Sequence, residues 1–265
     1  MRSLPFTVAL LLIASQASAG DCLVRIGYPD RERYPYYVGN GSGPATPPGV
    51  GVELLSRSVL HAGCKVALVR MPTARLKLAL AAGAIDLTPY DFIDGETLRA
   101  ALPLAADGKP DRKRALRTMG VVYVRSADAA AAGADPRAYF KQHRLAANQG
   151  TVLAGQLRAA GINVDDGASD TISNFEKVML KRADGVAITV VGEKVMDGAI
   201  AARYGKAMVR IETPIKTSYT WFATNQAFYQ SHRQQVESIW NWSGTQAPAQ
   251  HDELIKKYAP RQGSR

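Results

Sequence analysis

The segment Lys65–Asp86, KVALVRMPTARLKLALAAGAID, constrains the fold more than any other part of this 265-residue chain. The run from Lys65 to Val69 is nearly continuous in apolar residues, which is typical of a strand buried on both faces of a parallel sheet. Pro72 ends this strand because proline has no N–H for a sheet ladder. Leucines and alanines then continue at helical spacing as far as Gly83, which suits a left-handed helix C-cap, and Ile85 begins another strand. A strand, a crossover helix and a second strand form a βαβ unit, so the sequence predicts an α/β fold.

Similar patterns extend along the rest of the chain. Apolar runs predict further strands at 23–26, 120–124, 145–148, 186–191, 208–211 and 219–224. Amphipathic spacing predicts helices at 50–62, 152–160, 174–181, 193–203, 227–240 and 251–258.

The first 19 residues have the features of a cleavable secretory signal. A basic residue, Arg2, precedes an apolar run from Val8 to Ala14, and the small-residue motif Ala17-Ser18-Ala19 follows. The apolar run is too short to span a membrane. Asp21 occupies the position before Cys22 where a lipoprotein signal needs a small residue, so no lipid anchor is expected. We therefore expect a periplasmic protein whose mature chain is long enough for two lobes.

The formal net charge of +10 is compatible with nucleic acid, an acidic surface or an anionic small ligand as partner. The basic residues are spread along the chain, and the densest cluster, Lys109–Arg117, is typical of a solvated helix face. An exported protein seldom meets nucleic acid, so we expect no nucleic-acid partner. The role of the Lys109–Arg117 insertion is left open.

The chain's two cysteines, Cys22 and Cys64, each stand immediately before a predicted strand. If these strands are parallel neighbours, their starting ends lie about 5 Å apart, which is disulfide distance. Export to an oxidising compartment favours a Cys22–Cys64 bridge over the alternative of two buried thiols. Two cysteines and four scattered histidines lack the spacing of metal ligands, so no metal site is expected.

Three polar or aromatic segments follow predicted strands, at the sheet edge where ligands bind in α/β proteins. The loop 28–48 contains Tyr36, whose ring could stack on a ligand or could merely cover the loop. Tyr90 and Asp91 follow Pro89 at the end of the next strand. Gly150-Thr151 opens a helix, where free N–H groups attract anions, although Thr151 could equally be a plain N-cap.

Four segments resemble sequence motifs of one family, the family 3 periplasmic solute-binding proteins. Gly49–Leu54 resembles the family's G-F-D-[VI]-[DE]-L, with Gly51 in place of the acidic residue. Pro72–Asp86 resembles P-W-x-R-L…L-x-x-G-x-[VI]-D, with Thr73 where an aromatic residue is usual. Asn148–Thr151 and Lys181–Gly185 resemble V-Q-x-G-[ST] and G-R-[VA]-D-A.

The resemblance implies a two-lobed type II periplasmic-binding-protein fold, each lobe a mostly parallel sheet flanked by helices. Lobe 1 would comprise 20–119 and 216–265, and lobe 2 would comprise 120–215. Such receptors clamp a small ligand between the lobes and serve ABC importers of polar amino acids. A monomer without cofactor is implied, with an inner-membrane ABC permease or a periplasmic protein as partner.

The resemblance also suggests binding residues. The family grips the ligand carboxylate with an arginine in a T-x-x-R segment; Arg99 is the nearest match, one residue out of step. Arg75 is a second cation near the same cleft, or else a surface arginine. Tyr36 and Tyr90 would form stacking walls, and Thr73 would lie on one wall of the cleft. Asp91, Gly150 and Thr151 would make the polar contacts.

Thr189 stands where the family has the acidic residue that pairs with an α-amino group. Without that carboxylate an amino acid's ammonium is poorly paired, unless Asp91 or Glu193 substitutes. We therefore favour a small anion or amide with an aromatic-stacked body.

Two other classes of function compete with transport. One is a non-transport accessory of the same fold, such as the partner of a redox enzyme or a sensor kinase. The other is a cleft dehydratase, which needs a carboxylate or histidine as general acid or base. The four histidines fall on predicted helices or loop edges, so Asp91 or Glu193 would have to serve. We expect a binding protein and no enzyme.

Overall fold

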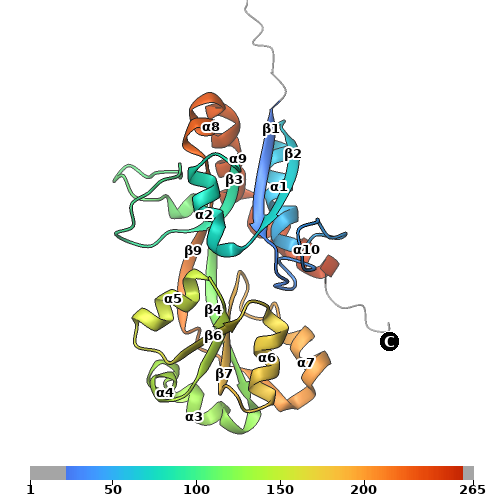
Figure 1. Ribbon diagram of the computed structural model, residues 1–265, viewed down its shortest axis with the longest axis vertical. Helices are drawn as coiled ribbons and strands as arrows, with labels where there is room; N and C mark the ends of the chain where they lie inside the picture. The colour runs from blue at the N-terminus through green and yellow to red at the C-terminus, as the bar shows by residue number, and fades with distance from the viewer. Residues whose placement is uncertain (1–21, 259–265) are drawn as a thin grey trace, which may run out of the picture.

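The computed structural model describes residues 22–258, which form two lobes (Figure 1). The predicted signal, residues 1–19, lies outside this range. Within 22–258, no helix is both long enough and apolar enough to cross a membrane.

The upper lobe in Figure 1 is built from the two ends of the described chain. Its strands are β1 (Leu23–Pro29), β2 (Lys65–Met71) and β3 (Leu87–Asp91). Its helices are α1 (Val50–His61), α2 (Thr73–Ala81), α8 (Gln226–Ser231), α9 (Arg233–Thr245) and α10 (Ala247–Tyr258).

The lower lobe is built from the middle of the chain. Its strands are β5 (Leu145–Asn148), β6 (Val164–Ala168), β7 (Gly185–Val190) and β8 (Met208–Arg210). Its helices are α3 (Ala129–Ala134), α4 (Pro136–Gln142), α5 (Val152–Ala159), α6 (Thr171–Met179) and α7 (Asp197–Tyr204).

Two long strands, β4 (Leu116–Arg125) and β9 (Lys216–Thr224), run between the lobes and join their sheets. The strand order is β2-β1-β3-β9-β4-β7-β5-β6, with β8 paired to β4. The pairs β1·β2, β1·β3, β5·β6 and β5·β7 are parallel, whereas β4 and β9 are antiparallel to their neighbours. This confirms the predicted α/β class with two lobes around mostly parallel sheets. The exact lobe boundaries stay a prediction.

The segment Lys65–Asp86 folds as β2 and α2 and leads into β3. Strand β1 lies between β2 and β3, since Ile26 pairs with both Leu68 and Leu87. Asp86 fixes this arrangement because its carboxylate accepts hydrogen bonds from the backbone N and the Nε of Arg25, both at 2.8 Å, and from Nη2 at 2.6 Å. The acidic residue of the motif thus has a structural role here.

The predicted disulfide is confirmed. Leu23 of β1 pairs in parallel with Lys65 of β2, so the residues before them are neighbours. Cys22 and Cys64 are bonded, with their Cα atoms 4.7 Å apart.

Each lobe has its own buried core. In the upper lobe, called lobe 1 below, Val24, Leu54 and Ile239 pack with Trp240. The indole Nε1 of Trp240 donates a hydrogen bond to the carbonyl of Phe222 at 2.6 Å. Lobe 2 buries side chains on both faces of its sheet. These separate cores leave the surfaces where the lobes meet free to form a site.

Several sequence predictions differ from the structure. The expected helix 227–240 is two helices that meet at His232. The basic cluster Lys109–Arg117 includes a 3₁₀ turn at Arg112–Arg114 that leads into β4, and Arg114 is ion-paired with Asp111 and Glu237. The expected helix 193–203 begins later, at Asp197. Strand β6 was not predicted because its sequence, VDDGA, is that of a partly exposed edge strand with little apolar content.

Candidate ligand-binding cleft

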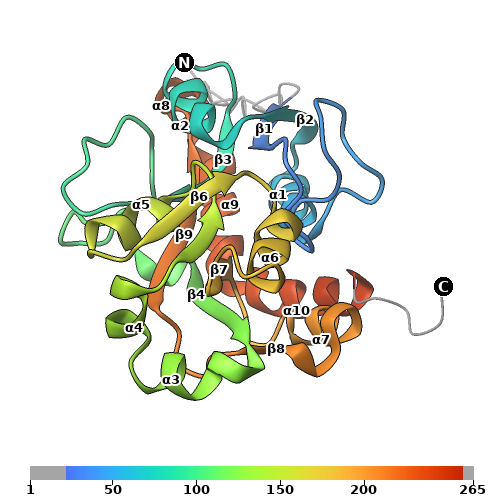
Figure 2. The same ribbon diagram turned by 60° about the horizontal axis from the view of Figure 1, so that its bottom comes forward.

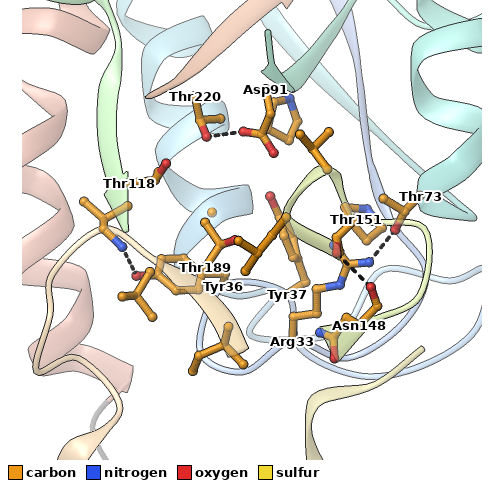
Figure 3. A pocket seen from close by; sticks show the side chains of 18 of the residues that line it. Arg33, Tyr36, Tyr37, Thr73, Asp91, Thr118, Asn148, Thr151, Thr189 and Thr220 are labelled. Carbon is orange, nitrogen blue, oxygen red and sulfur yellow. Dashed lines mark hydrogen bonds between the residues drawn. The ribbon is translucent and has the colours of Figure 1, made fainter. Parts of the chain in front are cut away.

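A cavity of about 450 Å³ lies between the lobes (Figure 3). Lobe 1 contributes the loop after β1, the start of α1, the first turn of α2 and the end of β3. Lobe 2 contributes the turn between β5 and α5 and the end of β7. Strands β4 and β9 cross beside it with Thr118 and Thr220. The volume is within the range of small-molecule sites.

Most of the residues predicted from the sequence to bind a ligand do line this cavity. These are Tyr36, Thr73, Asp91, Gly150, Thr151 and Thr189. They come from segments far apart in the chain that the fold brings together, as strand ends suggested for Tyr36, Asp91 and the Gly150-Thr151 turn. Thr73 and Thr189 were indicated by the family resemblance.

Three of the predicted residues lie elsewhere. Arg75 is exposed on α2, and Arg99 is exposed beside a separate groove next to α9. Tyr90 is only 4% exposed and packs inside lobe 1, where the Nζ of Lys77 lies 4.1 Å from its ring centroid. Alternation along β3 explains this, because Asp91 faces the cavity and its neighbour Tyr90 therefore points to the other face.

Arg33 is the cation that sequence reasoning missed. It lies in the loop after β1, and its Nη2 donates a hydrogen bond of 2.7 Å to the Thr73 hydroxyl (Figure 3). Its Nε is buried without a hydrogen-bond partner, and no carboxylate within 22–258 forms an ion pair with it. Burial lowers the pKa of Arg33, but an arginine keeps its charge because its usual pKa exceeds 12. The sequence did contain one signal for Arg33: it stands just before the aromatic segment Tyr34-Pro35-Tyr36-Tyr37, which was expected near the ligand.

Asp91 is the acidic residue of the cavity. Its carboxylate accepts a hydrogen bond from the Thr220 hydroxyl, and it makes no ion pair within the described range. Burial is the main cause that raises the pKa of Asp91. The nearby cation, Lys77, is bonded instead to the Asp91 backbone carbonyl at 3.0 Å and to Glu96 at 2.8 Å.

Three tyrosines of the β1–α1 loop line the cavity, Tyr34, Tyr36 and Tyr37. The Tyr36 hydroxyl accepts a hydrogen bond of 2.8 Å from the backbone N–H of Val191, so it links the loop of lobe 1 to the end of β7 in lobe 2. Its ring stacks on His251 of α10 at 5.9 Å. Burial raises the pKa of Tyr37 to about 12, so its hydroxyl is neutral.

The β5–α5 turn forms the lobe 2 wall. Gly150 adopts a φ of +70°, a left-handed conformation that favours glycine. The Thr151 hydroxyl accepts from the Ala154 N–H at 3.3 Å and donates to the Asn148 carbonyl at 2.7 Å. Thr151 is therefore an N-cap, as one of its two interpretations predicted, and it also lines the cavity. The Asn148 side chain is held by Thr171 and Asn174.

Apolar side chains cover much of the remaining wall. They include Leu54, Leu55, Leu116, Val190 and Phe222. Among the described lining residues there is no histidine, and within 22–258 no cluster of His, Cys, Asp or Glu is placed to hold a metal. The arrangement is suited to holding a small molecule with a negatively charged group next to Arg33.

No protein-family profile matches the chain, and no curated protein matches it in sequence. Solved structures do match. The ligand-binding core of GluR0 in complex with L-glutamate has a TM-score of 0.63 at 10% identity, over 91% of this chain and 99% of that one. The arginine-bound amino acid ABC transporter substrate-binding protein AbpA from Streptococcus pneumoniae has a TM-score of 0.60 at 13% identity, over 89% and 94%.

An ancestral amino-acid-binding protein, AncCDT-1, described as a precursor of cyclohexadienyl dehydratase, has a TM-score of 0.55 at 15% identity, over 89% and 95% of the two chains. These identities are low, but the matches span nearly the whole of each chain. The resemblance found in the sequence is thus confirmed at the level of the fold: the chain has the two-lobed architecture of the type II periplasmic binding proteins.

Proposed function

We propose that this protein is an exported solute-binding protein that clamps a small polar or anionic ligand between its lobes and serves an ABC importer. The observation that carries the proposal is the guanidinium of the partly buried Arg33, which lines the cavity, forms no ion pair within 22–258 and has a buried Nε without a hydrogen-bond partner. A buried charge is costly unless it is paired, so a ligand anion would complete this site.

The other lining groups support the same role. The carboxylate of the ligand would lie beside Arg33, Thr73 and the Gly150-Thr151 turn, where an arginine offers several donors in a fixed geometry. Tyr36, Asp91 and Thr189 would contact the remainder of the ligand. The solved neighbours that are bound to amino acids support a binding role in general terms.

Transport is proposed over catalysis because no assembled catalytic set lines the cavity within the described residues. Asp91 is partly buried and has a raised pKa, so it is the group that could act as a general acid in the alternative, a dehydration. Turnover of a cyclohexadienyl acid by the purified protein, lost in Asp91→Asn, would support that alternative.

A thermal-shift screen tests the proposal. Amino acids, carboxylates and amides are tested at millimolar concentration, and a ligand that binds the folded state raises the Tm by mass action. We expect a carboxylate to raise the Tm of the wild type and to have little effect on Arg33→Gln. Arg99→Gln is the matched control, since it removes an exposed arginine outside the cavity.

A screen without any hit contradicts the proposal. If a partner protein is then recovered by pull-down, the non-transport accessory function is favoured instead. A hit that is equally strong in Arg33→Gln would show that Arg33 is not the anchor.

A further inference from the structure

Two residues that line the cavity each have a buried polar atom with no hydrogen-bond partner within 22–258. These atoms are the Nε of Arg33 and the Oγ1 of Thr118. Thr118 is 4% exposed. Because buried polar atoms in proteins are almost always paired, each of them marks a place where a ligand atom can supply the missing bond.

The two atoms belong to different parts of the cavity. Arg33 lies beside Thr73 and the β5–α5 turn, whereas Thr118 lies on β4, near Thr220 (Figure 3). Figure 3 shows Arg33 and Thr118 on opposite sides of the pocket, with the ring of Tyr37 between them. A ligand that reaches both atoms needs one polar group at each end.

The apolar lining residues limit what can join these two ends. Leu54, Leu116 and Phe222 bring carbon atoms to the cavity wall, and they belong to the lobe 1 core. A hydrocarbon body is favoured against such walls, whereas an additional charge there would be desolvated without compensation.

The surroundings of Arg33 favour a carboxylate but offer little to a neighbouring ammonium. The Thr73 hydroxyl already accepts from Arg33, and the Thr151 hydroxyl accepts from the Ala154 N–H. The side-chain oxygen of Asn148 accepts from Asn174 at 2.8 Å. Each of these oxygens already accepts one hydrogen bond and none of them is charged, whereas the Nε of Arg33 is a buried donor without a partner within the described residues.

The one acidic side chain among the described lining residues, Asp91, does not contact this group. Its carboxylate is bonded to Thr220, and Figure 3 shows that pair apart from the Arg33–Thr73 pair. The charges of Asp91 and Arg33 influence each other without forming an ion pair, and burial raises the pKa of Asp91. An α-ammonium beside a carboxylate held at Arg33 would therefore meet in Asp91 an acid whose charged form is disfavoured.

From these contacts we propose that the ligand is a monocarboxylate with an apolar body, a hydrogen-bonding group at the end remote from the carboxylate, and no ammonium beside it. The carboxylate is held by Arg33, and the remote group bonds to Thr118. This inference rests on the proposed binding function and names the ligand class of the same cavity.

The test uses sets of acids that share one carbon skeleton. The aromatic set is 3-(4-hydroxyphenyl)propanoate, L-tyrosine, which adds the α-ammonium, and 3-phenylpropanoate, which lacks the remote hydroxyl. The aliphatic set is 6-hydroxyhexanoate, 6-hydroxynorleucine and hexanoate. Isothermal titration calorimetry measures each Kd with the wild-type protein.

In at least one set we expect the hydroxy acid to bind about tenfold or more tightly than its amino-acid analogue, because an unpaired buried ammonium is penalised. We also expect it to bind more tightly than the acid without hydroxyl. Thr118→Val has a similar volume but no hydroxyl. It is expected to abolish the preference for the hydroxy acid over the acid without hydroxyl, and to keep the preference for the hydroxy acid over the amino acid. A far-ultraviolet circular dichroism spectrum and Tm equal to those of the wild type show that the variant is folded.

Each other outcome overturns the inference. Tighter binding of the amino acids in both sets, or a hydroxyl preference that survives Thr118→Val, contradicts the ligand class but leaves the binding function in place. If none of the six acids binds but another compound in the wider screen does, the ligand class is again contradicted and the binding function stands. Failure of every compound in both experiments contradicts the binding function as well.

Discussion

At the scale of single residues, the charged side chains that line the cavity are those of Arg33, Lys77 and Asp91, and Lys77 is already paired with Glu96. The family motif directs attention to an arginine after β3, but the segment that holds Arg99 leads to the outer surface of lobe 1. Arg33 reaches the cavity from a different loop and is fixed there by Thr73. Motif matching alone does not indicate this loop as the source of a cavity-lining cation.

Asp91 gives a prediction about pH. Burial raises the pKa of Asp91 in the folded protein above that in the unfolded chain, about 3.9. The folded state then binds the proton more tightly, so the contribution of Asp91 to the free energy of unfolding is largest at low pH. It falls as the pH rises through the folded-state pKa. The asparagine of Asp91→Asn cannot ionise, so this variant is expected to lack the decrease in the free energy of unfolding that Asp91 causes as the pH rises.

Urea unfolding of the ligand-free protein at several pH values between about 3.5 and 7 measures this effect. We expect the stability of Asp91→Asn relative to the wild type to increase with pH. Asp94→Asn, at an exposed position in the next loop, is the control and should show no such trend. A stability difference for Asp91→Asn that stays constant or decreases with pH would disprove the assignment.

At the scale of elements, the disulfide ties the start of β1 to the start of β2. The bond closes a loop with a sequence separation of 42 residues. In the chain-entropy model a loop of this length contributes about 4 kcal/mol to the free energy of unfolding. We expect the double variant Cys22→Ala/Cys64→Ala to lose stability of this order in urea unfolding. Added reductant should destabilise the wild type but not the double variant; equal stability of both proteins would contradict the prediction.

The sequence was sufficient to predict most buried elements, because their patterns reflect local packing. The apolar run of β2, the helix after Pro72 and the pairing of the two cysteines all followed from the residues themselves. Strand β6 was missed because an edge strand carries a weak apolar pattern.

The candidate site was predictable only in part, for the same physical reason. Strand ends indicated Asp91 and Thr151, because parallel strands bring their carboxyl ends to one edge, and the family resemblance indicated Thr73. The direction of a side chain in a long loop is set by contacts between distant segments. Arg33 is oriented by Thr73, 40 positions away, and no local pattern encodes that bond.

At the scale of the whole molecule, the lobes are joined by β4 and β9 and also touch across the cavity. Figure 2, which brings the lower lobe forward, shows β4 and β9 side by side along the middle of the molecule, as their pairing requires. The bond from the Val191 N–H to the Tyr36 hydroxyl crosses from lobe 2 to lobe 1. This contact adds a direct hydrogen bond between the lobes to the two strands that join them.

Removal of that contact should allow the two lobes to move further apart. Tyr36→Phe leaves the Val191 N–H without its partner, so we expect a larger radius of gyration in small-angle X-ray scattering of the ligand-free protein. Tyr34→Phe is the matched control, because the Tyr34 hydroxyl bonds to the Tyr258 carbonyl within lobe 1. Identical scattering from Tyr36→Phe and the wild type, or equal expansion in both variants, would contradict a role in closure.

The central claim is that Arg33 anchors an anionic ligand between the lobes. Calorimetric titration of the strongest carboxylate from the ligand screen into the wild type, Arg33→Gln and Arg99→Gln tests it most directly. Loss of a hydrogen-bonded charge partner in a buried site costs about 2–5 kcal/mol, so we expect Arg33→Gln to weaken binding by about 30-fold or more and Arg99→Gln to leave the Kd unchanged. Unchanged binding in Arg33→Gln, or an equal loss of binding in both variants, would contradict the account.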